Sequence, residues 1–221
     1  MKYIAALGLL FFTAGLWAQV SPQALEEDVF RYPLGRQTTS EFITTCSRLA
    51  EHPFIRGNFE QEKTLSRLNR SLKSSGNFII AKDMGMVWDT VNPFPSTMTL
   101  GRDYIIQFRN GGQKTVLGAQ GNETFLRMAE VISSVFSGNA QGLLDNFEVY
   151  YSGSAAAWEL GLSPLDSAIN SFAEKIVMKG DAVIRSIQIY EQNGDAVKYT
   201  LSNHSYPVEL NVHEKAFFSY P

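Results

Sequence analysis

From Phe54 onward the chain consists largely of short segments in which apolar and polar residues alternate. A period of two places alternate side chains on the same face of a β-strand. Turn-forming residues separate the segments, as in Asn110-Gly111-Gly112 and Gln192-Asn193-Gly194-Asp195. The expected strands are 54–60, 76–82, 86–90, 97–100, 104–108, 114–117, 147–152, 156–160, 176–179, 183–190 and 196–202. The sequence therefore predicts an antiparallel meander of about ten to eleven strands.

A different period, of three to four residues, marks two longer segments as amphipathic helices. They are 39–52 and 122–136, and shorter helices are expected at 22–30 and 139–144. The apolar stripes comprise Phe42, Ile43, Cys46 and Leu49 in the first long segment, and Phe125, Met128, Ile132 and Val135 or Phe136 in the second. Such stripes need an apolar surface to pack on, so we expect these helices to cover one face of the sheet in an α+β fold.

The start of the chain has the pattern of a secretory signal peptide. Lys2 is followed by an uncharged, mostly apolar run over residues 4–18 that ends in Ala18. The alternative is a membrane anchor, but spanning a bilayer takes about 20 apolar residues and this run is shorter. We therefore expect residues 1–18 to be removed and residues 19–221 to form a single domain.

Composition excludes several classes of protein. The 19 basic and 22 acidic residues give a net charge of -3, so there is no basic footprint for nucleic acid. Cys46 is the only cysteine and cannot form a disulfide within the chain. It lies on a helical apolar stripe, where a small core residue is expected rather than a nucleophile. His52, His204 and His213 are too scattered for a metal site. We expect no catalytic residues, metal or cofactor.

One face of the predicted sheet is continuously apolar. Its side chains and those of the second long helix are Phe59, Phe78, Ile80, Met86, Trp88, Met98, Leu100, Ile106, Phe125, Met128 and Ile132. Periodicity alone leaves two interpretations open. The helices can fill this face as an ordinary dry core, or part of it can be an adaptable cavity wall, which methionine and aromatic side chains suit.

The stretch from Phe59 to Pro95 carries a family resemblance. It contains F-x-Q-x-K from Phe59, S-S-G-x-F from Ser74 and G-x-x-W-x-x-x-x-P from Gly85. Together with the later segment IQIYEQNGDAVKYTLSNHS, this stretch resembles the LolA family of periplasmic lipoprotein carriers. The resemblance implies an incomplete antiparallel β-barrel with helices as a lid over its concave apolar face.

The resemblance also implies a function for that face. A monomeric, non-enzymatic protein of the periplasm would take acyl chains of a lipoprotein or related lipid from an inner-membrane exporter. It would deliver them to an outer-membrane acceptor. By position, Met86 and Trp88 match the strand that lines the family's cavity, and Phe125 and Met128 match its lid helix. The residues listed above are therefore the expected lipid-binding cavity.

One departure from the family pattern concerns lid control. The resemblance implies an arginine in the loop before the tryptophan strand, where it holds the lid closed. Here the loop reads Ala81-Lys82-Asp83-Met84-Gly85, and Lys82 offers a point charge without the planar fork of a guanidinium. Two alternatives therefore remain: a lipid or lipoprotein sensor acting through protein contacts, as in the similar RseB domain, and an enzyme acting on an envelope lipid.

Four cations stand close together between the first two expected strands: Lys63, Arg67, Arg70 and Lys73. Charge runs of this kind are usually solvated loops. The functional alternative is a docking edge for an acidic partner or an anionic head group, which would speed encounter more than it adds affinity.

Overall fold

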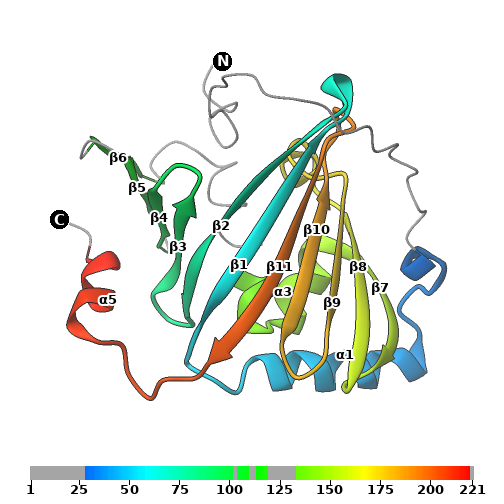
Figure 1. Ribbon diagram of the computed structural model, residues 1–221. Coiled ribbons are helices and arrows are strands. Elements are labelled where there is room, and N and C mark those ends of the chain that lie inside the picture. Colours follow the sequence, from blue (N-terminus) through cyan, green and yellow to red (C-terminus); the bar gives the residue numbers. More distant parts are fainter. Residues whose placement is uncertain (1–27, 102–103, 110–112, 119–132, 220–221) are drawn as a thin grey trace.

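The computed structural model describes residues 28–101, 104–109, 113–118 and 133–219. They form one 11-stranded antiparallel sheet with short helices (Figure 1). The predicted number of strands and the α+β class are confirmed. The strands are β1 Phe54–Leu65, β2 Arg70–Ala81, β3 Gly85–Asn92, β4 Ser96–Leu100, β5 Tyr104–Arg109, β6 Gln113–Gly118, β7 Phe147–Ser154, β8 Ala157–Pro164, β9 Lys175–Gly180, β10 Ile184–Tyr190 and β11 Ala196–Ser205.

The sheet consists of two meanders, β1 to β6 and β7 to β11, joined where the first strand pairs with the last. The strand order is β6-β5-β4-β3-β2-β1-β11-β10-β9-β8-β7. Strands β6 and β7 are the two edges of the sheet and do not pair with each other, so the curved sheet is an incomplete barrel. Two glycines at turns have positive φ: Gly85, with φ 122°, begins β3, and Gly194, with φ 84°, lies in the predicted turn between β10 and β11.

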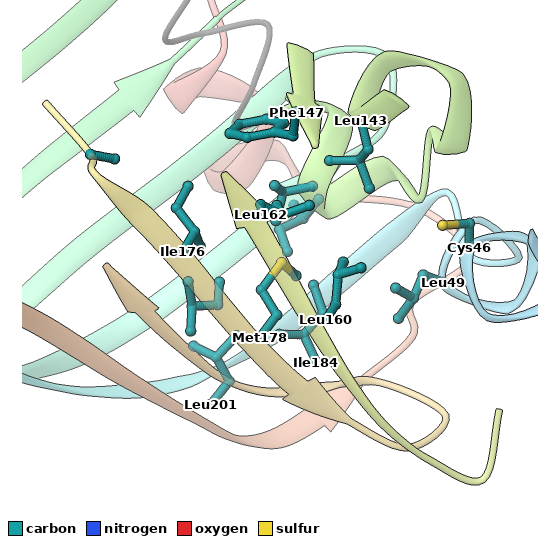
Figure 2. Packing of buried hydrophobic residues seen from close by; sticks show 14 of the residues in the cluster. Cys46, Leu49, Leu143, Phe147, Leu160, Leu162, Ile176, Met178, Ile184 and Leu201 are labelled. Carbon is teal, nitrogen blue, oxygen red and sulfur yellow. The ribbon is translucent and has the colours of Figure 1, made fainter. Parts of the chain in front are cut away.

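Helices α1 (Arg36–Leu49) and α3 (Ala140–Asn146) pack on the concave face, and Figure 1 shows α1 lying across the ends of the strands. The stripe of α1 buries Phe42, Cys46 and Leu49, as expected, while Ile43 is 47% exposed. Figure 2 shows side chains of α1 beside those of β8 and β9. A buried hydrogen bond of 2.7 Å between the hydroxyl groups of Thr45 and Tyr151 ties α1 to β7.

The convex face is covered near both ends of the described chain. The 3-10 helix η2 (Asp28–Arg31) contacts β7 and β8. On the other meander, the segment after β11 carries α5 (Val212–Phe217), and Leu210 and Phe218 are buried against Ile79 and Val87. This second cover lies outside every predicted element, although the capping box between Asn211 and Glu214 is a helix-start signal in the sequence.

Several boundaries differ from the predictions. Strands β1 and β2 extend as a long hairpin whose connection is only η3 (Ser66–Leu68), so the four-cation segment is mostly strand and not a loop. The polar residues of this hairpin lack the apolar alternation that marks a strand. Of the predicted helices, 122–136 lies outside the described residues except for a helical turn over 133–137, and 22–30 lies largely outside them. A short helix α4 (Ser167–Asn170) was not predicted.

Candidate functional site

A pocket opens at the rim of the concave face, where the two meanders meet. Its cavity volume is about 20 Å³, and the empty space reaches about 370 Å³ only when the part open to solvent is counted. Its walls come from the end of α1, the first residues of β1, the turn between β9 and β10, and the end of β11. The lining residues are Arg48, Leu49, His52, Ile55, Phe78, Ile80, Phe136, Ala182, Val183, Ile184, Leu201, His204 and Tyr206.

Local irregularities of β1 and β11 shape this pocket. Asn203 adopts a left-handed conformation with φ 52°, and the register of β1 with β11 shifts between Arg56 and Asn58. A bulge changes the direction of the side chains that follow it, and His204 accordingly lines the pocket. Phe78 lies across Gly57, where any side chain would collide with its ring. The ring of Phe78 also meets that of His204 edge-on, at 5.7 Å between centroids.

The rim of the pocket is polar and basic. The rings of His52 and Tyr206 stack at 3.9 Å. Arg48, in the last turn of α1, donates from Nη1 to the carbonyl oxygen of Ala155 at 3.3 Å. Burial and the nearby Arg185 guanidinium hold the pKa of His204 below its ordinary value, against the opposing effect of a hydrogen bond with the Ile184 backbone. A histidine in this setting favours its neutral form.

Deeper on the concave face, aromatic rings surround Trp88. Its ring stacks on Phe59 at 4.3 Å and on Phe78 at 5.9 Å, and meets Tyr199 edge-on at 5.2 Å. Burial, with a smaller effect of Glu191, raises the pKa of Tyr199 to about 12. This phenol therefore stays neutral, which suits an apolar wall.

Seven of the predicted cavity residues share the concave face. The register aligns Phe78 with Trp88 and Met98, and Ile80 with Met86 and Leu100. Phe59, Phe78, Ile80, Met86 and Leu100 are buried, while Trp88 and Met98 are only partly buried. Of these, Phe78 and Ile80 also line the pocket. The sequence thus indicates the face correctly, but most of the predicted wall is packed core.

The expectation for Ile106 is wrong. Ile106 lies opposite Thr99, which lies opposite Val87, so all three belong to the convex face. Ile105 takes the expected place, because it pairs with Leu100. Two adjacent isoleucines make the alternation ambiguous, and a one-residue slip reverses the face. Phe125, Met128 and Ile132 lie outside the described residues.

The structure does not bring the four cations together on one surface. Lys63 and Lys73 point to opposite faces of the β1–β2 hairpin. Lys63 is 17% exposed and pairs with Glu191 at 2.8 Å, whereas Lys73 is 76% exposed and lies 3.8 Å from Glu62. Arg67 belongs to η3, and Arg70 begins β2. A single docking edge made of all four therefore does not form.

Lys82 reaches the helix that covers the sheet. Its Nζ donates to the carbonyl oxygen of Ala50, the C-cap residue of α1, at 3.3 Å. A cation at a helix C-terminus interacts favourably with the helix dipole. Lys82 thus contacts the end of α1 through one hydrogen bond. It stands in the loop where the family resemblance implies an arginine.

Sequence reasoning missed the polar rim. The sequence pattern marks His52 and His204 only as possible metal ligands, and it gives no reason to select Arg48 or Tyr206. The aromatic and basic residues at the ends of α1 and β11 were a usable signal, but the bulge that directs His204 has no clear signature in the sequence. Cys46 is buried, and burial raises its pKa to about 12, consistent with a core residue.

Within the described residues, no group of three or more His, Cys, Asp or Glu is placed to hold a metal ion. A search for helices long and apolar enough to cross a membrane finds none in the same part of the chain.

An open antiparallel sheet with an apolar concave face under helices is an incomplete β-barrel. Residues 40–206 match the family described as outer membrane lipoprotein carrier protein LolA-like, and the chain belongs to this family. A search of the curated proteins found no match.

Solved structures with a similar fold share few identical residues with the chain. A DUF1329 family protein from Desulfovibrio piger is 10% identical over 83% of this chain and 97% of that chain, with a TM-score of 0.47. A LolA superfamily protein from Nitrosomonas europaea is 7% identical over 82% and 97%, with a TM-score of 0.45. The Pseudomonas aeruginosa MucA/MucB complex contains a chain that is 11% identical over 83% and 61%, with a TM-score of 0.37.

Proposed function

We propose that this protein is a non-enzymatic carrier that holds acyl chains of a lipoprotein, or of a related lipid, against its concave face. The observation that carries the proposal is the partly exposed position of Trp88 and Met98 on that face, beside a buried aromatic cluster. An apolar wall of this kind offers an acyl chain a surface without a chemical step. Membership in a family of lipoprotein carriers supports the same conclusion.

The energetic need for such a carrier is large. Each methylene left in water costs about 0.8 kcal/mol, so a sixteen-carbon chain costs on the order of 10 kcal/mol to cross an aqueous space unshielded. A carrier must also release its cargo, so adaptable contacts with methionine and aromatic side chains suit it better than a tight fit.

The cellular setting is part of the same proposal. The signal-peptide pattern of residues 1–18 supports export to the periplasm. There the remaining chain, 19–221, would act as a monomer between an inner-membrane exporter and an outer-membrane acceptor. Fractionation of cells carrying the full-length gene tests this setting, because recovery of uncleaved protein in the cytoplasm contradicts it.

Acyl capture is tested by substituting Trp88. Introducing a carboxylate with Trp88→Glu should abolish binding of acyl lipid, because the charge would have to be desolvated beside the chain. The measurement is mass spectrometry of lipid extracted from protein purified from its native host. Val91→Glu is the matched control, since Val91 lies on the same strand and is 45% exposed.

Circular dichroism establishes that both variants fold. If Trp88→Glu proves unstable, Trp88→Phe is the second variant. It keeps an apolar ring and should retain capture. Normal capture by a folded Trp88→Glu protein, or absence of acyl lipid from the unmodified protein, contradicts the proposal.

A further inference from the structure

We propose that the rim pocket binds the polar end of a single-chain lipid, and that its rim selects an anionic head group, a carboxylate or a phosphate. This inference rests on the proposed function and names the class of lipid that the same concave face accepts. It assigns a role to Arg48 and His204, which acyl-chain binding alone does not use.

The pocket is apolar inside and polar at its mouth. Leu49, Ile55, Ile184 and Leu201 line it and belong to the apolar cluster of the concave face, or pack against it. The polar groups Arg48, His52, His204 and Tyr206 line the same pocket. A lipid has this same division, so its chain would lie along the concave face with its head group at the rim.

Arg48 supplies the charge. A guanidinium has five N–H donors, and the hydrogen bond to Ala155 uses one of them. Among the residues that the structure describes, no carboxylate forms an ion pair with Arg48. The nearby Asp181 is already engaged, since it pairs with Arg185 at 2.9 Å and accepts from the Val183 amide at 3.1 Å. The net charge offered to a ligand is therefore positive.

The negative end of the α1 dipole would oppose an anion at this position. Lys82 offsets it, because its ammonium group donates to Ala50 at that same helix end. The rim therefore contains two cations around one helix terminus, and Arg48 is the one that lines the pocket.

His204 supplies an unused hydrogen-bonding atom. Its Nδ1 is buried and has no hydrogen-bond partner in the described part of the chain. Buried polar atoms nearly always have one. An anion bound at the rim would favour the protonated form of the His204 ring, which donates from both nitrogens. The unmet hydrogen bond and the unpaired guanidinium thus favour the same kind of ligand.

The test compares three sixteen-carbon probes that differ only in the head group: palmitate, hexadecyl phosphate and hexadecanol. Equilibrium dialysis below the micelle concentration measures their dissociation constants with the chain 19–221. We expect the two anions to bind about tenfold tighter than the alcohol, as a charge-assisted hydrogen bond at a partly exposed site provides. The order of the two anions then separates a fatty acid from a phosphorylated lipid as the source of the head group.

Arg48→Gln should weaken the binding of both anions about tenfold and leave hexadecanol unchanged. Arg36→Gln is the matched control, because Arg36 begins the same helix, is exposed, and loses the same charge far from the pocket. His204→Phe keeps a ring beside Phe78 and removes the buried nitrogen, so it should weaken the anions and spare the alcohol.

Binding of hexadecanol as tight as that of both anions overturns the head-group inference and leaves the carrier proposal standing. An equal loss in Arg36→Gln and Arg48→Gln also overturns it, since the effect would then be long-range charge and not contact at the rim. Failure of all three probes to bind contradicts the carrier proposal itself.

Discussion

The two meanders use the same concave face differently. In the half formed by β7 to β11, which we call the filled half, α1 and α3 pack on the sheet and residues such as Tyr151, Leu162 and Met178 are at most 1% exposed. In the half formed by β1 to β6, the open half, Trp88 and Met98 on the concave face stay partly exposed. The first half is packed core on this face, and under the proposed function the second is the surface that meets the ligand.

On the convex face, by contrast, the open half is covered. There the segment after β11 packs on β2 and β3 and buries their apolar side chains. Arg56 on β1 holds this segment through an ion pair with Glu214, with Nε to Oε1 at 2.7 Å, and Tyr104 donates to the carbonyl oxygen of Phe218 at 2.7 Å. The strands of the open half thus gain fixed packing from the convex side.

The largest effect is expected in the filled half. Leu162→Ala should lower the free energy of unfolding by about 3 kcal/mol, because it leaves a cavity at a fully buried site. Met98→Ala should cost about 1 kcal/mol, because solvent and neighbouring side chains can occupy the space. Urea unfolding measures both, and equal costs would break the comparison of the two halves.

The convex cover should stabilise the open half without taking part in capture. Leu210→Ala removes a side chain that is 1% exposed, and should cost about 2 kcal/mol in urea unfolding. Val208→Ala, at a side chain that is 93% exposed, is the control and should change little. Acyl capture by folded Leu210→Ala should stay normal, and loss of capture would show that the two faces are coupled.

The attachment of α1 to the filled half can be weakened by a single hydroxyl. Thr45→Val leaves the buried Tyr151 hydroxyl without its partner, and should cost about 1 to 2 kcal/mol. Thr44→Val is the control, because Thr44 is exposed and its hydroxyl donates only to the Ser40 carbonyl of its own helix. Thermal unfolding of both variants measures the difference, and equal losses would contradict the role of this contact.

The smallest effect is a pH dependence at the junction of the halves. Since the pKa of His204 is below 6.5 in the folded protein, the unfolded chain binds more protons between that lower pKa and 6.5. Stability should therefore fall as the pH drops through this range. His204→Asn should remove this part of the dependence while leaving the contributions of other groups. Identical pH profiles for both proteins would contradict the assignment.

Much of the fold was predictable because turns and alternation are local signals. The Asn193-Gly194 turn and the strands beside it were predicted, and the glycine has the positive φ that such a turn needs. Ile106 shows the limit: adjacent apolar residues in β5 leave the face undetermined until its pairing with β4 is known.

The site was predictable only in part. Phe78 and Ile80 were expected on the concave face and do line the pocket. The rim depends on contacts between distant segments, as between His52 and Tyr206, and on the bulge at Asn203. Neither leaves a periodic pattern, so the sequence predicted the apolar face but not the polar residues at the rim of the pocket.

The pairing of β1 with β11 has a consequence for how the chain folds. Asn58 lies opposite Ser202 and Thr64 opposite Ala196, so the central contact of the sheet joins residues more than a hundred positions apart. Contacts of such long range slow folding, because the loop between them must be closed first. During synthesis, β1 lacks one neighbour until nearly the whole chain has been made. The centre of the sheet thus remains incomplete until β11 has been synthesised.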